Sequence, residues 1–173
     1  MSADAEMPVD PIEEMGPTKP LPEHAWLQRL IGEWTSRSEI VMPDGSKAES
    51  HGTETFRALG DLWVYGEASV SMPDGSTMDT ISGYGYDVSF KHYVGFWISN
   101  FSSHLWKYSG SLSEDGTTLT LDCVGPDMVN EGQTANYRGT MTFLDDDHRT
   151  LTASGQMPDG QWAVFMTDHY TRR

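Results

Sequence analysis

Cysteine is almost absent from this 173-residue chain, and basic residues are scarce. The single cysteine, Cys123, excludes an internal disulfide, because a disulfide needs two. Eleven lysines and arginines are outnumbered by 26 aspartates and glutamates, which gives a net charge of −15 with histidine neutral. Such a charge repels phosphate backbones and anionic lipid surfaces, and it favours solubility. We therefore expect neither a nucleic acid nor a membrane as a partner of this acidic protein.

Long apolar runs are also missing. The N-terminus has no basic segment followed by an apolar one, as a signal peptide would have. No stretch of the chain is apolar enough, over enough residues, to read as a membrane-spanning helix. We expect a soluble, cytoplasmic protein.

The motifs of common catalytic and metal sites are missing too. The six histidines include no pair four residues apart and no His-Glu-x-x-His, so no metal site is predicted. There is no Gly-x-Ser-x-Gly, and Gly83-Tyr84-Gly85-Tyr86 lacks the lysine and the following helix of a phosphate-binding loop. Cys123 alternates with Leu119 and Leu121, which is typical of the buried face of a strand. This pattern favours a packed thiol over a catalytic one, which would need a neighbour that stabilises the thiolate.

The chain does contain the tetrapeptide Met-Pro-Asp-Gly three times, beginning at Met42, Met72 and Met157. Each copy separates two runs of strand-forming residues. Proline fixes φ for the first central position of a type I turn, aspartate tolerates the second, and glycine adopts the left-handed conformation that follows. Each copy therefore predicts a β-hairpin.

The rest of the chain divides into a tail, one helix and many strands. Residues 1–20 hold four prolines and five acidic residues with little that could pack, which predicts a disordered tail. In 21–32, apolar residues recur at spacings of three and four and Gly32 follows, which predicts one short helix. The predicted strands are 34–42, 47–57, 62–72, 77–86, 93–100, 104–112, 117–124, 134–144, 149–157 and 161–171.

Short connections between successive strands favour antiparallel neighbours, and closing such a meander removes its two exposed edges. We therefore predict an all-β fold, a single domain over residues 21–173 that forms an up-and-down barrel of about ten strands. The three Met-Pro-Asp-Gly turns each join an odd-numbered strand to the next even one. They should therefore lie at one rim, and the helix, Trp34 and the connections at 59–61 and 87–90 should lie at the other.

Gly32-Glu33-Trp34 resembles the Gly-x-Trp signature of calycin-type barrels, the group of lipocalins, fatty-acid-binding proteins and nitrobindin-like proteins. In that group the tryptophan plugs one end of the barrel and is often covered by an arginine near the end of the last strand. Here Arg172 or Arg173 would take that position.

A broader resemblance covers about His24 to Tyr170. The helix with His24 and Leu27, the segment 57–63, and Gly83-Tyr84-Gly85-Tyr86-Asp87 leading into 93–97 are similar to the bacterial family known as domain of unknown function 1579. This resemblance implies a calycin-like barrel. It implies no activity, cofactor or catalytic residues.

Alternate residues of barrel strands point into the lumen, so the lumen is the candidate site. Aromatic candidates for its wall are Trp63, Tyr65, Tyr84, Trp97 and Trp106. Polar candidates are His51, Arg57, Glu67, Asp79, His104, Tyr108 and Arg138. A period of two does not say which face of a strand is inside, so the alternative for each is the solvent-exposed face.

The leading functional prediction is that the lumen binds a small apolar or amphipathic ligand, because the aromatic residues exceed what turns and edges need. One alternative is a lyase or isomerase that uses lumenal acid–base residues. Another is a filled barrel that serves as a structural or homo-oligomerisation module. No cofactor is predicted, and haem bound through His169 near the C-terminus is a further option that the nitrobindin-like barrels suggest.

Overall fold

The computed structural model describes residues 16–173, which form one short helix and ten strands. The helix is α1 (Pro22–Gln28). The strands are β1 (Gly32–Val41), β2 (Lys47–Leu59), β3 (Trp63–Ser71), β4 (Thr77–Asp87), β5 (His92–Ser99), β6 (Ser102–Leu112), β7 (Thr118–Pro126), β8 (Thr134–Phe143), β9 (His148–Gln156) and β10 (Trp162–Arg172). The predicted tail lies mostly outside the described residues.

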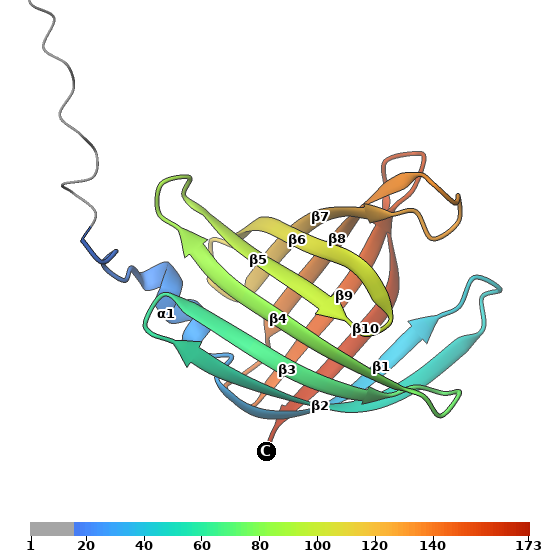
Figure 1. Ribbon diagram of the computed structural model, residues 1–173, viewed down its shortest axis with the longest axis horizontal. Coiled ribbons are helices and arrows are strands. Elements are labelled where there is room, and N and C mark those ends of the chain that lie inside the picture. Colours follow the sequence, from blue (N-terminus) through green and yellow to red (C-terminus); the bar gives the residue numbers. More distant parts are fainter. Residues whose placement is uncertain (1–15) are drawn as a thin grey trace, which may run out of the picture.

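The ten strands form a closed antiparallel barrel in which each strand pairs with its neighbours in sequence (Figure 1). The barrel closes where β1 pairs with β10, from Trp34 opposite Arg172 to Ile40 opposite Met166. Closure gives partners to the backbone groups that an open meander would leave exposed at its edges. The predicted all-β, up-and-down barrel is confirmed, and each predicted strand corresponds to an observed one.

The three Met-Pro-Asp-Gly turns have one shared geometry. Gly45, Gly75 and Gly160 adopt φ of 82°, 85° and 84°, where only glycine is free of strain. In each turn the glycine N–H donates to the carbonyl of the methionine, at 2.8 to 2.9 Å. All three turns lie at the end of the barrel away from α1, as their positions between odd and even strands require (Figure 1).

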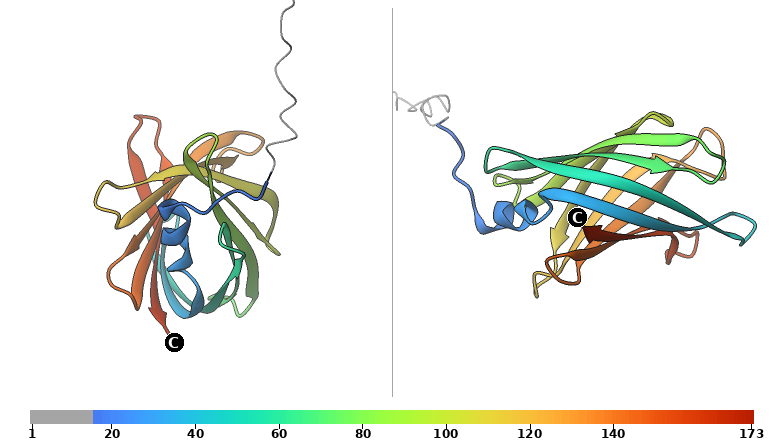
Figure 2. Two further views of the ribbon diagram at one scale, coloured as in Figure 1. Left: turned by 90° about the vertical axis from the view of Figure 1, so that its left-hand side faces the viewer. Right: turned by 90° about the horizontal axis from the view of Figure 1, so that it is seen from below.

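Helix α1 lies across the other end of the barrel and closes it (Figure 2). Proline in its first turn suits the start of a helix, and its apolar residues Trp26 and Leu27 are buried against the strand ends. Beneath the helix, Trp34 is fully buried and its indole N–H donates to the Leu30 carbonyl at 2.8 Å. Arg172 covers the same indole, 4.1 Å from the ring centre. The tryptophan plug that the calycin resemblance implies is therefore present.

Glycines on the outer face of the wall lie beneath aromatic rings. On the outer face, the Trp63 ring lies over Gly85 and the Phe96 ring over Gly83, so close that an added Cβ would meet each ring at 2.5 Å. Glycines next to aromatic residues let the sheet curve while the rings cover the bare backbone. The glycines of the Gly83-Tyr84-Gly85-Tyr86 segment therefore serve the packing of the barrel wall.

Candidate functional site

The inner face of the barrel has an aromatic side and a hydroxyl side. The aromatic side comes from β4, β5, β6 and β8, and its rings are Tyr84, Trp97, Trp106, Tyr108 and Tyr137. The hydroxyl side comes from β1, β2 and β4, and its buried members are Ser36, Ser38, Ser50, Thr80 and Ser82. A lumen with one side of each kind suits a molecule that has both apolar and hydrogen-bonding surface.

The lumen is filled at the α1 end and more accessible at the turn end. Near α1, the inner residues Trp34, Phe56 and Val64 are at most 2% exposed. Toward the turns, Trp97 and Trp106 are only half-buried, although both point inward. Within residues 16–173, α1 is the only helix, so no helix covers the turn end.

A cluster of ionisable residues lies between the filled end and the accessible end. We call Arg149, Glu54, Asp168 and Tyr170 the Arg149 cluster. Arg149 is 1% exposed and forms an ion pair with Glu54, whose side chain is 11% exposed. The Arg149 guanidinium also lies over the Tyr170 ring, 3.6 Å from its centre, and 4.7 Å from the centre of Trp34. The Tyr170 hydroxyl donates to Asp168 Oδ2 at 3.4 Å.

Burial controls the ionisation of this cluster. It raises the pKa of the Glu54 carboxyl, against the opposing effect of Arg149. It also raises the pKa of the Asp168 carboxyl, although the Ser38 and Tyr170 hydroxyls and the Arg149 charge act in the other direction. Burial likewise raises the pKa of Tyr84 to about 12. The carboxyls of the cluster are thus held closer to neutrality than exposed ones would be.

The wall is incomplete between β6 and β7. Their pairing runs only from Ser109 opposite Asp122 to Leu112 opposite Leu119, so the remainder of each strand has no partner across the gap. The Trp106 ring fills part of the gap by lying against Gly125. His104 Nε2 lies 3.3 Å from the Val124 carbonyl oxygen on the far side.

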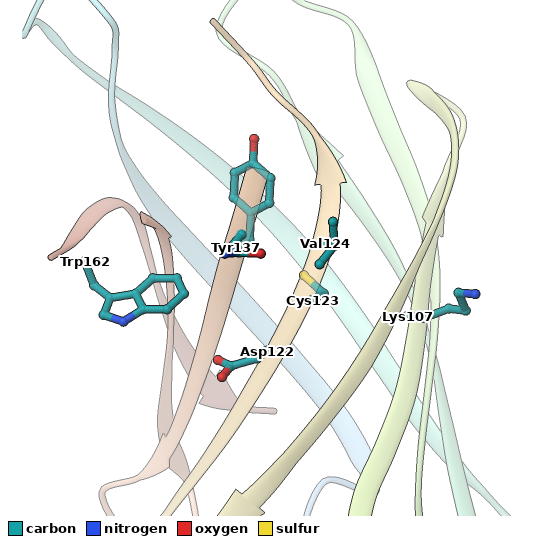
Figure 3. Close-up of a pocket in the computed structure, with 7 residues that line it drawn as sticks. Lys107, Asp122, Cys123, Val124, Tyr137 and Trp162 are labelled. Atoms are coloured by element: carbon teal, nitrogen blue, oxygen red, sulfur yellow. The ribbon is translucent and has the colours of Figure 1, made fainter. Parts of the chain in front are cut away.

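A hollow of about 470 Å³ lies along this incomplete part of the wall (Figure 3). Its lining combines outer-face and inner-face residues, namely Lys107, Asp122, Cys123, Val124, Asn136, Tyr137 and Trp162. Arg138 borders it from outside, with Nε and Nη2 donating to Asp122 at 2.7 and 2.9 Å and its guanidinium 4.2 Å from the centre of Trp162. Cys123 is buried here, and burial raises its pKa to about 11, which is unlike an activated thiol.

Five of the twelve predicted lumen residues do point inward. They are Tyr84, Trp97, His104, Trp106 and Tyr108. The structure brings them together: the Tyr84 and Tyr108 rings stack with centres 6.4 Å apart, and the His104 and Trp106 rings meet edge to face at 5.0 Å. Their role in binding remains a prediction.

The other seven lie on the outer face, which corrects their predicted place in the lumen. They are His51, Arg57, Trp63, Tyr65, Glu67, Asp79 and Arg138. Several form surface contacts instead: Arg57 pairs with Glu67 at 2.7 Å, and Asp79 accepts from Ser69 at 2.8 Å. The physical reason is that their strand neighbours, such as Phe56 and Gly66, fit the interior, and in a strand the neighbour takes the opposite face.

Three inward charged residues were missed by sequence reasoning, namely Glu54, Arg149 and Asp168. Each shares its strand face with residues that the structure buries, as Glu54 does with Phe56. That alternation is the available signal, but a period of two does not say which face of a strand is inside. His169, the haem option, points outward from β10, with Nε2 3.9 Å from Glu39. Within residues 16–173 no group of three or more acidic, histidine or cysteine side chains is arranged to hold a metal ion.

The sequence pattern of the family described as "Protein of unknown function (DUF1579)" matches residues 19–172. The chain belongs to this family. No curated protein sequence matches it significantly.

Two solved structures share the fold of this DUF1579 protein. Rv2717c from M. tuberculosis matches with a TM-score of 0.60 and 11% identity, over 90% of this chain and 99% of that one. The S-type phycobiliprotein lyase CPES from Guillardia theta matches with a TM-score of 0.58 and 12% identity, over 88% of this chain and 92% of that one. In the described part of the DUF1579 chain, no helix is long and apolar enough to cross a membrane.

Proposed function

We propose that this DUF1579 protein binds a small apolar or amphipathic molecule in the barrel lumen, entering from the turn end or through the incomplete wall between β6 and β7. The observation that carries the proposal is that Trp97 and Trp106 are only half-buried on the inner face. A filled barrel would bury two inward indoles, as the α1 end buries Trp34. An accessible inward aromatic surface is what a binding cavity offers a ligand.

A glycine beside the aromatic residues supports the same proposal. Gly139 of β8 faces inward between Leu121 and Ala153, and an added Cβ would find its nearest neighbours at 3.8 and 3.9 Å. An added Cβ would therefore make ordinary van der Waals contacts here, unlike at Gly66, where it would meet the Phe56 ring at 2.7 Å. The wall at Gly139 is thus less tightly packed than at Gly66.

The test is binding of the neutral apolar dye Nile red by the purified full chain, followed by dye fluorescence and by quenching of tryptophan emission. Gly139→Leu adds a side chain to the lumen and should weaken dye binding by about tenfold or more, since it occupies the space a ligand needs. The matched control is Thr140→Leu, which places the same side chain on the outer face of β8 and should leave binding unchanged. Absence of dye binding by the unaltered protein, or equal loss in both variants, would refute the proposal and favour a filled barrel.

An enzymatic function is the second candidate, and one observation favours it. Asp168 is a buried, inward carboxyl with a raised pKa, which is a property of general acids. The fold is also that of a protein named a phycobiliprotein lyase, but the likeness at 12% identity concerns the fold alone. Native mass spectrometry of the purified protein would identify a bound compound to test as a substrate. If the protein is an enzyme, Asp168→Asn should lose turnover of that compound and retain dye binding.

A further inference from the structure

We propose that the Arg149 cluster is the polar subsite of the lumen and receives an uncharged head group that both donates and accepts hydrogen bonds, as a primary amide or a hydroxyl does. This inference rests on the proposed function, because it names the chemistry of the ligand's polar end. It assigns the aromatic side of the lumen to the ligand's apolar part.

Two orphan atoms of the cluster carry the inference. Arg149 Nε, a donor, and Asp168 Oδ1, an acceptor, are both buried without a hydrogen-bond partner among the described residues. A buried polar atom without a partner costs free energy, so its persistence calls for an explanation such as a missing ligand. Arg149 Nε can donate a hydrogen bond, and Asp168 Oδ1 can accept one. A ligand head group that both accepts and donates hydrogen bonds can therefore pair with both atoms.

The charges and the orphan atoms of the cluster together disfavour an ionic head group. Arg149 is already paired with Glu54, so its positive charge is compensated inside the protein. A carboxylate brought to the subsite would meet Asp168 and Glu54 with no free positive charge to offset them. An ammonium group could donate to Asp168 Oδ1, but it has no acceptor for Arg149 Nε and would leave that buried donor without a partner. An uncharged head group avoids both costs.

The position of Asp168 sets the orientation of the bound molecule in the lumen. On β1, Ser38 lies opposite Asp168, and on β2, Ser50 lies opposite Ser38, so buried hydroxyls surround the subsite on this side. One inward position nearer the turns, Met166 is half-buried and apolar. The polar end would therefore lie at the cluster and the apolar end would extend toward the turns and the tryptophans.

The test compares three molecules with the same chain and different heads, namely decanamide, decanoate and decylamine, as competitors of Nile red at pH 7.5. The amide should displace the dye at least about tenfold more effectively than either ion, because only the amide satisfies both orphan atoms without an unpaired buried charge. Decanoate or decylamine binding as tightly as the amide would overturn the inference while leaving lumen binding intact. Failure of all three molecules and of the dye to bind would overturn the proposed function itself.

Asp168→Asn tests the assignment to this cluster. It removes a negative charge and supplies a donor, so the preference for decanamide over decanoate should fall to about twofold or less. The matched control is Asp79→Asn, at an exposed aspartate on the outer face of β4, which should keep the full preference. A preference that survives in Asp168→Asn would contradict the role of Asp168. The head-group comparison on the unaltered protein decides the inference even if that variant does not fold.

Discussion

Arg172 joins the last strand to the helix end of the barrel through Trp34. Its guanidinium lies 4.1 Å from the centre of the Trp34 ring, and its Nη1 and Nη2 donate to the carbonyls of Ile31 and Arg29 at 2.6 and 2.8 Å. The arginine therefore satisfies the carbonyls that follow α1, where the helix itself offers no donors. Arg149 lies 4.7 Å from the centre of the same indole, so the plug contacts two cations.

Replacing Arg172 should weaken the barrel at this junction. Arg172→Met keeps an unbranched apolar side chain but removes the charge and the donors, and we expect a loss of about 3 kcal/mol in the free energy of unfolding. Urea denaturation followed by tryptophan fluorescence measures it. Arg173→Met is the control, since the Arg173 side chain is exposed, and it should change stability by less than about 0.5 kcal/mol. Similar losses in the two variants would mean that the contacts around Trp34 contribute little.

The buried ion pair of the Arg149 cluster should respond differently from an exposed one. Glu54→Leu leaves the Arg149 charge buried without a partner, which should cost about 3 to 5 kcal/mol. Replacing both partners, in Glu54→Leu with Arg149→Met, should recover much of that loss, because no buried charge remains. A double variant as unstable as the sum of the two single variants would contradict this expectation.

The exposed pair Arg57–Glu67 provides the reference for that experiment. Both side chains are more than half exposed, at 52% and 59%. Glu67→Gln should therefore change the free energy of unfolding by less than about 1 kcal/mol. Urea denaturation of Glu54→Leu, Arg149→Met, the double variant and Glu67→Gln at one pH and salt concentration makes the comparison direct.

Much of this fold could be predicted from the sequence because its signals are local. The left-handed glycines of the three turns, the periodicity around Trp26 and the alternation in each strand all act over a few residues. From these local signals the order of the strands follows, since short connections permit only antiparallel neighbours.

The candidate site was less predictable because it depends on which face of each strand is inside. Tyr65 and Tyr84 belong to neighbouring strands and look alike in sequence, yet Tyr65 is outside and Tyr84 inside. The outer position of Trp63 is set by its packing over Gly85, a contact across two strands. Arg149 and Asp168 can lie inside because the Arg149 charge pairs with Glu54 and also acts on Asp168. These contacts form only once the barrel has closed.

Alkaline pH should destabilise the barrel through its buried tyrosines. Burial raises the pKa of Tyr84 and of Tyr93 from 10.0 to about 12, so the folded state keeps protons that the unfolded chain releases. Their stabilising contribution is complete below pH 10 and is lost as pH rises toward about 12. Absorbance at 295 nm should show these phenols ionising near pH 12, and the free energy of unfolding should fall over the same interval. Tyr84→Phe should reduce that fall, and an unchanged slope would count against the assignment to Tyr84.

Two inward glycines that look equivalent in sequence should tolerate alanine very differently. At Gly110 of β6, an added Cβ would lie 1.8 Å from the Thr120 carbonyl oxygen, which belongs to the backbone of β7. The backbone cannot move aside without breaking the short pairing between β6 and β7, so Gly110→Ala should cost about 2 kcal/mol or more. At Gly139 the nearest atoms are 3.8 Å away, and Gly139→Ala should be neutral or stabilising by up to about 1 kcal/mol, because alanine restricts the unfolded chain. Thermal and urea denaturation of the two variants measure the difference, and equal effects would mean that the wall at β6 and β7 yields more easily than its packing indicates.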